Sequence, residues 1–100
     1  MVTLSVTRSR VAGVLRATAS LLETEGWDPL RNPVMDAIDR AAGYVPGKGT
    51  RDAEETTLAA WNALVTHLDE RLIVPWERTP GRTQQQIVAG LRAAADGLAS

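Results

Sequence analysis

The chain has 100 residues, of which 44% are hydrophobic and 23% charged, and this composition is typical of one globular domain. Eleven basic residues oppose twelve acidic ones, whereas a dedicated nucleic-acid-binding module usually carries a clear basic excess. The chain has no cysteine, which excludes disulfides, thiolate metal sites and cysteine nucleophiles. A single histidine leaves little scope for imidazole chemistry.

The N-terminal residues carry no targeting signal that we can identify. Residues 1–8 lack an apolar core of signal-peptide length, and we expect them to be a frayed lead-in to the first helix. No window of the chain approaches the roughly 18–20 apolar residues that a membrane span needs. We therefore expect a cytoplasmic protein that makes no contact with membranes.

Apolar residues at helical spacing predict a first helix over about Ser9–Glu25. The hydroxyl of Ser9 is the predicted N-cap, and Gly26 follows the last turn where a left-handed residue would end the helix. Trp27 comes next, at a position where an apolar side chain often folds back onto the last turn.

A shorter second helix is predicted over about Pro33–Ala42. Asn32 is the expected N-cap, and a proline at the first helical position has a suitable φ and no N–H to satisfy. Gly43 is the expected left-handed residue at the end. The following residues, 44–50, hold two glycines and a proline, which indicates a loop.

The third predicted helix is the longest, over about Arg51–Leu72, and Pro75 marks a position beyond its end. Trp61 lies in the middle of its apolar stripe, and we expect this side chain to anchor the core. The stripe consists of Leu58, Trp61, Leu64, Val65, Leu68 and Leu72.

The fourth predicted helix spans about Gln84–Leu98 and begins with a capping box, in which Thr83 and Gln86 satisfy each other's backbone N–H groups. Its apolar residues extend over two lines, the second through Val88 and Ala95. One monomer core could leave part of this surface uncovered, so a homodimer through this helix is a hypothesis, and its alternative is coverage by the first and third helices. Taken together, the pattern predicts an all-α fold: a compact domain of three longer helices and one short helix, without a sheet.

Two tryptophan-containing motifs are similar to those of a known family. Gly26-Trp27 follows the first helix, an alanine-containing helix comes next, and Trp76-Glu77-Arg78-Thr79-Pro80-Gly81-Arg82-Thr83 precedes the last helix. From about residue 11 to residue 95 the chain resembles small uncharacterised proteins of actinobacteria and their phages. These proteins typically carry Gly-Trp, a helix with Cys-Leu, and W-N-D-x-P-G-R-T. Here Glu77-Arg78 replaces Asn-Asp and the cysteine is missing, and the resemblance implies no activity.

The loop before the last helix is the strongest candidate for ligand binding. Arg78 and Arg82 flank a Pro-Gly turn, Trp76 lies just upstream, and Thr83 stands at the N-terminus of the helix. Free backbone N–H groups at such a terminus bind anions, so these residues predict a site for a small anion or, less favourably, a nucleic acid. The alternative is a structural loop with Trp76 buried and both arginines paired to carboxylates.

No catalytic constellation appears elsewhere in the chain. His67 lacks a histidine or carboxylate four residues away, so it makes no helical metal motif. The acidic pairs Asp36/Asp39 and Asp52/Glu55 read as solvated helix surface rather than as an acid–base pair. The glycines around Lys48 have the wrong spacing for a phosphate-binding loop.

The sequence as a whole therefore predicts a small cytoplasmic interaction or accessory protein. We expect no catalysis, no metal and no cofactor, and we expect a protein partner or a second copy of the chain rather than a nucleic acid or a membrane. The rival hypothesis is the anion-binding loop described above.

Overall fold

The computed structural model describes residues 7–69 and 72–99. These ranges contain five helices and no β-sheet, although an isolated bridge joins Asp28 to Asn32. The predicted all-α class is confirmed, and the structure adds a fifth, short helix. The lead-in predicted for residues 1–8 lies mostly outside the described residues, and its last member, Arg8, already belongs to the first helix.

Helix α1 spans Arg8–Glu25. Its N-cap is Thr7, whose hydroxyl accepts a hydrogen bond from the backbone N–H of Arg10 at 3.1 Å. The cap therefore lies two residues before the predicted Ser9. Gly26 ends the helix with a φ of 89° and a ψ of 127°, so the positive φ expected of a glycine is present but the left-handed helical conformation is not.

Helix α2 spans Val34–Ala42 and has Pro33 at its N-cap. The prediction that Asn32 caps this helix is wrong, because its side chain serves the preceding turn and accepts a hydrogen bond from Arg40 at 2.7 Å. Proline has no side-chain acceptor, so the first N–H groups of α2 need a partner from elsewhere in the chain. Gly43 ends the helix in the left-handed conformation, as predicted.

Helix α3 spans Arg51–Leu68, four residues shorter than predicted, and ends at Asp69 in the left-handed conformation. A further helix, α4, spans Ile73–Glu77. Pro75 lies within α4, in its first turn, where a proline breaks no helical hydrogen bond. A proline after a long helical pattern indicates that a helix has ended, so the sequence pattern did not predict α4.

Helix α5 spans Gln84–Ala99 and begins with the predicted capping box. The backbone N–H of Thr83 donates to the Gln86 side chain at 3.0 Å, and the N–H of Gln86 donates to the Thr83 hydroxyl at 3.2 Å. Two of the free N–H groups at this terminus are thereby satisfied.

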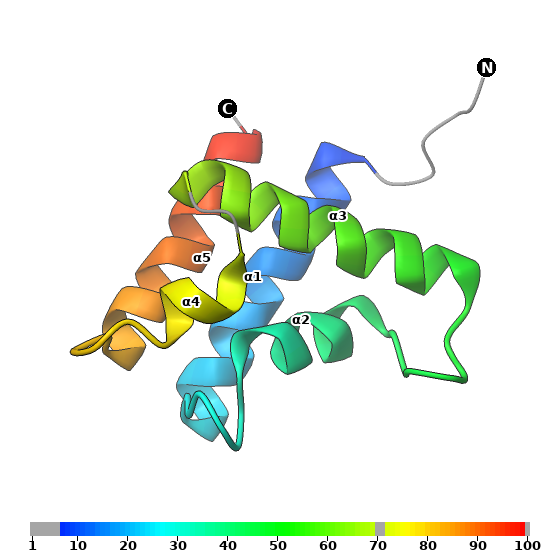
Figure 1. The fold of residues 1–100 in the computed structure, drawn as a ribbon. Coiled ribbons are helices and arrows are strands. Elements are labelled where there is room, and N and C mark those ends of the chain that lie inside the picture. Colours follow the sequence, from blue (N-terminus) through cyan, green and yellow to red (C-terminus); the bar gives the residue numbers. More distant parts are fainter. Residues whose placement is uncertain (1–6, 70–71, 100) are drawn as a thin grey trace.

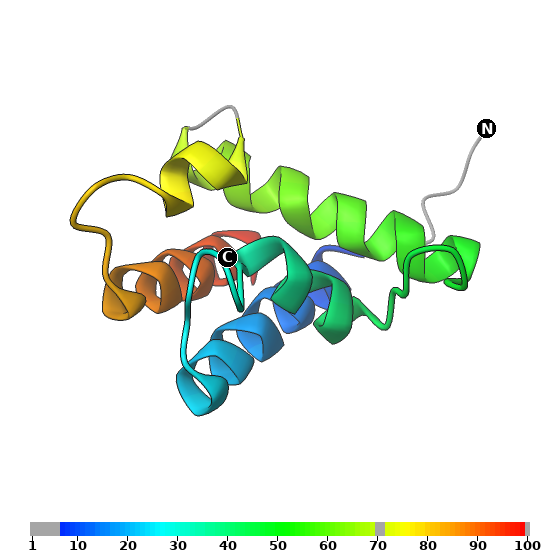
Figure 2. The same ribbon diagram turned by 60° about the horizontal axis from the view of Figure 1, so that its bottom comes forward.

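Helices α1 and α5 lie side by side and antiparallel, and α3 crosses over them with α2 and α4 nearby (Figures 1 and 2). Arg92 of α5 forms a two-pronged ion pair with Glu23 of α1, which holds the pKa of that carboxyl below its usual range. Between the helices lies a single apolar core, formed by Val11, Ala12, Val14, Leu15, Ala19, Leu22, Val34, Ala37, Ile38, Ala60, Leu64, Ile73, Trp76, Ile87, Val88, Leu91, Ala94 and Ala95.

The apolar face of α3 is divided in a way that the sequence analysis did not predict. Its buried residues are mostly small: Ala53, Thr56, Thr57, Ala60 and Leu64. Trp61 is only partly buried and Leu58 is exposed, so the prediction that Trp61 anchors the core is wrong. The buried tryptophan is Trp76 of α4, which is 5% exposed. Small side chains let α3 approach its neighbours closely, which turns its larger apolar residues toward the side.

The apolar residues of α5 are covered within the chain. Ile87, Val88, Leu91, Ala94 and Ala95 are buried in the core beside α1 and α3, and Leu98 is half-buried against it. The larger apolar residues of the stripe that suggested a homodimer are thus buried or half-buried within the chain, and the homodimer stays a hypothesis. Packing explains the glycine at position 90, because a Cβ at this position would lie 2.9 Å from the ring of Trp76.

Candidate functional site

The loop before α5 brings together two of the four residues predicted to bind a ligand. The Arg82 guanidinium lies 5.4 Å from the centre of the Trp76 ring, and its Nε donates to the Trp76 carbonyl oxygen at 3.1 Å. Thr83 is engaged in the cap of α5, and Arg78 is exposed at the end of α4. Trp76 is buried, as the alternative of a structural loop predicted, but Arg82 bonds to a backbone carbonyl oxygen rather than to a carboxylate.

Glu77, the residue after Trp76, connects the Gly26-Trp27 motif to the motif that begins at Trp76. It is 1% exposed, and its Oε2 accepts hydrogen bonds from Trp27 Nε1 and from the backbone N–H of Val34, both at 2.7 Å. The second bond supplies the acceptor that Pro33 cannot offer at the start of α2. Gln84 adds a third hydrogen bond between these segments, because its side-chain oxygen accepts from the backbone N–H of Trp27 at 2.7 Å. Glu77 therefore carries a structural carboxylate in this chain.

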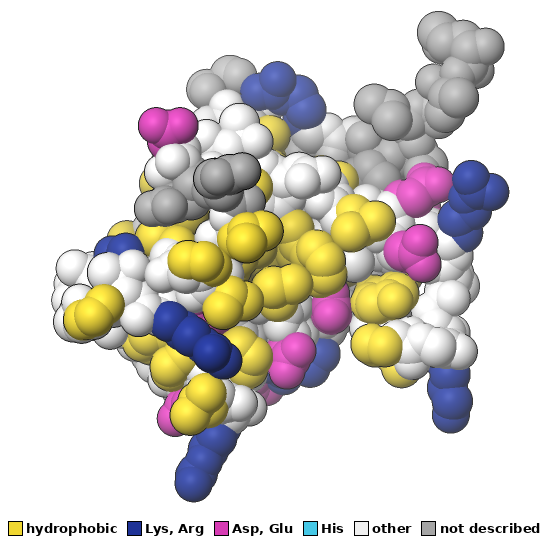
Figure 3. Space-filling model, in the orientation of Figure 1, with side chains coloured by type: hydrophobic (Ala, Val, Ile, Leu, Met, Phe, Trp, Pro, Cys, Tyr) yellow, Lys and Arg dark blue, Asp and Glu magenta, His cyan; other side chains and the backbone are white. Residues whose placement is uncertain are grey.

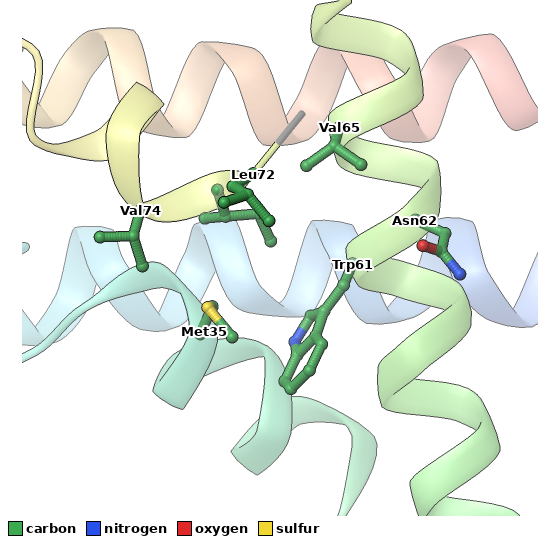
Figure 4. A pocket seen from close by; sticks show the side chains of 7 residues that line it. Met35, Trp61, Asn62, Val65, Leu72 and Val74 are labelled. Atoms are coloured by element: carbon green, nitrogen blue, oxygen red, sulfur yellow. The ribbon is translucent and has the colours of Figure 1, made fainter. Parts of the chain in front are cut away.

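A pocket of about 320 Å³ opens between α2, α3 and α4 (Figure 4). Its walls are almost entirely apolar, and it is the place where the larger residues of α3 face the short helix α4. The lining residues are Met35, Trp61, Asn62, Val65, Leu72, Ile73 and Val74.

The indole N–H of Trp61 is a polar group without a partner in this pocket. Its Nε1 is buried from solvent, and within the described residues it has no hydrogen-bond acceptor. Figure 4 shows the nitrogen edge of the ring facing the side where Met35 lies, while the Asn62 amide points away from the ring. A buried N–H without an acceptor costs about 1–3 kcal/mol, so this donor is an unusual feature of a folded chain.

The rim of the pocket is exposed and apolar. Leu72 is 64% exposed and Val74 is 39% exposed. On the face shown in Figure 3, apolar side chains gather over the middle of the molecule, in the region of α2, α3 and α4. This site was not predicted, because the apolar stripe on 51–72 assigns Trp61, Val65 and Leu72 to the core. The available signal was an apolar stripe on 51–72 with more large side chains than one buried face can hold.

The other groups considered for chemistry lie apart from one another. His67 lies in an open groove between α3 and α5, and the described residues that line this groove include no carboxylate. Asp39 is half-buried and accepts a hydrogen bond from the Thr57 hydroxyl at 2.6 Å. Burial raises the pKa of Asp39, and the nearby Asp36 adds to the effect.

The described residues contain neither a cluster of metal ligands nor a helix suited to cross a membrane. Among residues 7–69 and 72–99, no group of three or more His, Asp or Glu side chains is arranged to hold a metal ion. Over the same ranges, none of the helices combines the length and the apolar character that a membrane crossing requires.

Comparison with known proteins identifies the family. The model of a family described as "Family of unknown function (DUF6197)" matches residues 6–97, and the chain therefore belongs to this family. No curated protein and no solved structure gives a significant match. The matched residues include α1, α2, α3 and α4 and most of α5, together with both tryptophan motifs and the residues that line the pocket between α2, α3 and α4.

Proposed function

We propose that this member of a family of unknown function is a non-catalytic accessory protein of the cytoplasm, and that it binds a partner protein at the pocket between α2, α3 and α4. The observation that carries the proposal is the exposed apolar rim of this pocket, formed by Leu72 and Val74. Contiguous exposed apolar surface around a cavity is typical of docking sites for other proteins.

The position of Leu72 supports this proposal. Leu72 is the N-cap of α4 and makes no side-chain cap hydrogen bond there. Serine or aspartate at an N-cap is more favourable than leucine by about 0.5–2 kcal/mol. An exposed leucine at this position gives up local stability without adding to the core, which is expected where a surface is kept for binding.

The rival anion-binding site has less support from the geometry. Arg82 already stacks on Trp76 and bonds to its backbone, and Thr83 already caps α5. An anion would have to compete with these internal contacts for the same donors. The pocket, by contrast, has a free volume and a rim of apolar side chains.

Site-specific photo-crosslinking in the native host tests the proposal. A photoreactive phenylalanine analogue at Val74 should give a defined crosslinked protein, and Leu72→Ser should abolish this product because it removes the apolar rim. Leu72→Ser should leave the melting temperature unchanged or raise it, since serine suits the N-cap.

Leu30 provides the matched control, because it is 77% exposed but lies in the turn between α1 and α2, outside the lining of the pocket. Leu30→Ser should leave the crosslinked product at position 74 unchanged. If probes at positions 74 and 30 give the same products, or if Leu72→Ser and Leu30→Ser act equally, the pocket is not the docking site.

A further inference from the structure

The pocket combines apolar walls with a single buried N–H that has no acceptor, and this combination restricts what can occupy it. Building on the proposed function, we infer that the occupant is a peptide segment of the partner, which inserts an aliphatic side chain and places a backbone carbonyl oxygen against Trp61 Nε1. The walls supply apolar contact, and the indole N–H supplies one directional hydrogen bond.

The requirement for an acceptor follows from the state of Trp61. An indole N–H can only donate, so no rearrangement of its own ring satisfies it. Of the side chains that line the pocket only Asn62 carries an oxygen, and Trp61 Nε1 makes no hydrogen bond to it or to any other described residue. An incoming oxygen atom would remove the cost of this unpaired donor, and the gain would be specific to a ligand that has one.

The acceptor is a neutral one. Among the described residues, 7–69 and 72–99, those that line the pocket include no lysine, arginine or histidine. A carboxylate or phosphate placed there would lose its hydration without gaining an opposite charge, which is strongly unfavourable. A backbone carbonyl is the neutral acceptor that every residue of a peptide carries.

The size and shape of the site favour an aliphatic side chain on a peptide. About 320 Å³ lies at the lower end of the range of roughly 300–1,000 Å³ for ligand pockets, which suits a side chain better than a large cofactor. The exposed Leu72 and Val74 extend the apolar surface beyond the cavity, so the rest of a peptide segment can lie across them.

Met35 provides the means by which the donor is uncovered. Figure 4 shows its side chain on the side that the indole nitrogen faces. Methionine is unbranched and has three rotatable bonds, so it can move aside without disturbing the backbone of α2. The indole N–H, closed to solvent in the free protein, then becomes available to the carbonyl oxygen of the occupant.

The test is an NMR titration that follows the indole ¹H–¹⁵N signal of Trp61 with N-acetyl-leucine-N-methylamide as the probe. Binding should move the Trp61 indole proton downfield, as hydrogen bonding requires. Trp61→Phe, which keeps a ring and removes the donor, should weaken binding of this probe about 5- to 10-fold, the usual contribution of one hydrogen bond. Toluene, which has no acceptor, should bind the two proteins within about twofold of each other.

Two further arms keep the result interpretable. Leu72→Ser should weaken the binding of N-acetyl-leucine-N-methylamide while the fold is preserved. N-acetyl-alanine-N-methylamide should bind more weakly than this leucine probe, because it lacks the larger aliphatic side chain. The inference is overturned if the leucine probe does not bind, if the Trp61 signal stays fixed at saturation, or if Trp61→Phe weakens both probes equally. A Trp61 signal that shifts with protein concentration alone identifies a second copy as the occupant, and also overturns it.

The crosslinking and titration experiments fail independently. A specific crosslink at position 74 combined with a negative titration would retain the proposed function and reject the peptide-carbonyl occupant. A positive titration without a crosslink that depends on Leu72 would show a pocket of the inferred chemistry and reject the partner protein.

Discussion

Substitution of Glu77 should destabilise this protein more than substitution of any exposed acidic residue. Oε2 of Glu77 accepts the N–H groups of Trp27 Nε1 and Val34 at 2.7 Å each, and Glu77→Ala leaves both donors without an acceptor. Each loss costs about 1–3 kcal/mol, so we expect a decrease of about 3–4 kcal/mol in the free energy of unfolding. That is a large part of the 5–15 kcal/mol typical of a domain.

Glu77→Gln should cost less, about 1–2 kcal/mol, because one side-chain oxygen can still accept while the carboxylate at the N-terminus of α2 is lost. The assay is urea unfolding followed by far-ultraviolet circular dichroism. Glu54→Ala is the matched control, because Glu54 is an exposed acidic residue in the first turn of α3, where its removal should cost a few tenths of a kcal/mol. If the free energy of unfolding of Glu77→Ala lies within about 1 kcal/mol of the wild-type value, the hydrogen bonds from Trp27 and Val34 to Glu77 do not have the stabilising role assigned to them.

Three further outcomes follow from the packing and the charges. In urea unfolding, Gly97→Ala should stabilise α5 by about 1 kcal/mol, because alanine has the higher helix propensity. Gly90→Ala should destabilise the protein, because only the Cβ at position 90 would meet the Trp76 ring, at 2.9 Å. Equal effects of the two substitutions on the free energy of unfolding would contradict this packing. Trp76→Ala should cost about 3–5 kcal/mol and Trp61→Ala roughly half as much, since Trp61 is only partly buried; the reverse order would contradict the structure. Asp39→Asn should raise the melting temperature at pH 7, because burial raises the pKa of this carboxyl, which means that its charged form is disfavoured in the folded state. This advantage should shrink as the pH falls through the raised pKa, since the protonated wild type no longer carries the charge; an advantage that grows in acid would be the wrong sign.

The helices could be predicted from the sequence because their signals are local. The capping box at Thr83 and the left-handed Gly43 are set by nearest neighbours, and both are present as predicted. Where two local signals competed, the prediction failed: Thr7 rather than Ser9 caps α1. Helix α4 was missed because five residues carry too little periodicity to register, and its proline suggested the absence of a helix.

The orientation of α3 could not be obtained in the same way. Apolar residues cover a wide arc of this helix, and periodicity does not say which part of the arc faces the core. Tertiary packing chose the small residues Thr57 and Ala60 and left Trp61 at the side, where it lines the pocket. The candidate site was therefore outside the reach of a pattern that treats every apolar side chain as core.

Glu77 was unpredictable for a related reason. A glutamate in a loop motif is usually solvated, and its burial depends on donors from residues 43 and 50 positions earlier. The one available signal was Pro33 at the start of α2, which cannot cap its own helix. Because Pro33 cannot cap α2, it predicts that another residue supplies the acceptor for the first N–H groups of this helix, but it does not identify that residue.

The indole N–H groups of Trp27 and Trp61 provide the most direct measurement of the central claim, that the pocket holds a donor without an acceptor. Trp27 Nε1 lies 2.7 Å from its acceptor, Glu77 Oε2, so in one ¹H–¹⁵N spectrum of the free protein the Trp27 indole proton should resonate clearly downfield of the Trp61 indole proton. Both protons should exchange slowly with solvent, since Trp27 Nε1 is hydrogen-bonded and Trp61 Nε1 is buried. A Trp61 indole proton as far downfield as that of Trp27 would show that the donor is already satisfied, and would contradict the account.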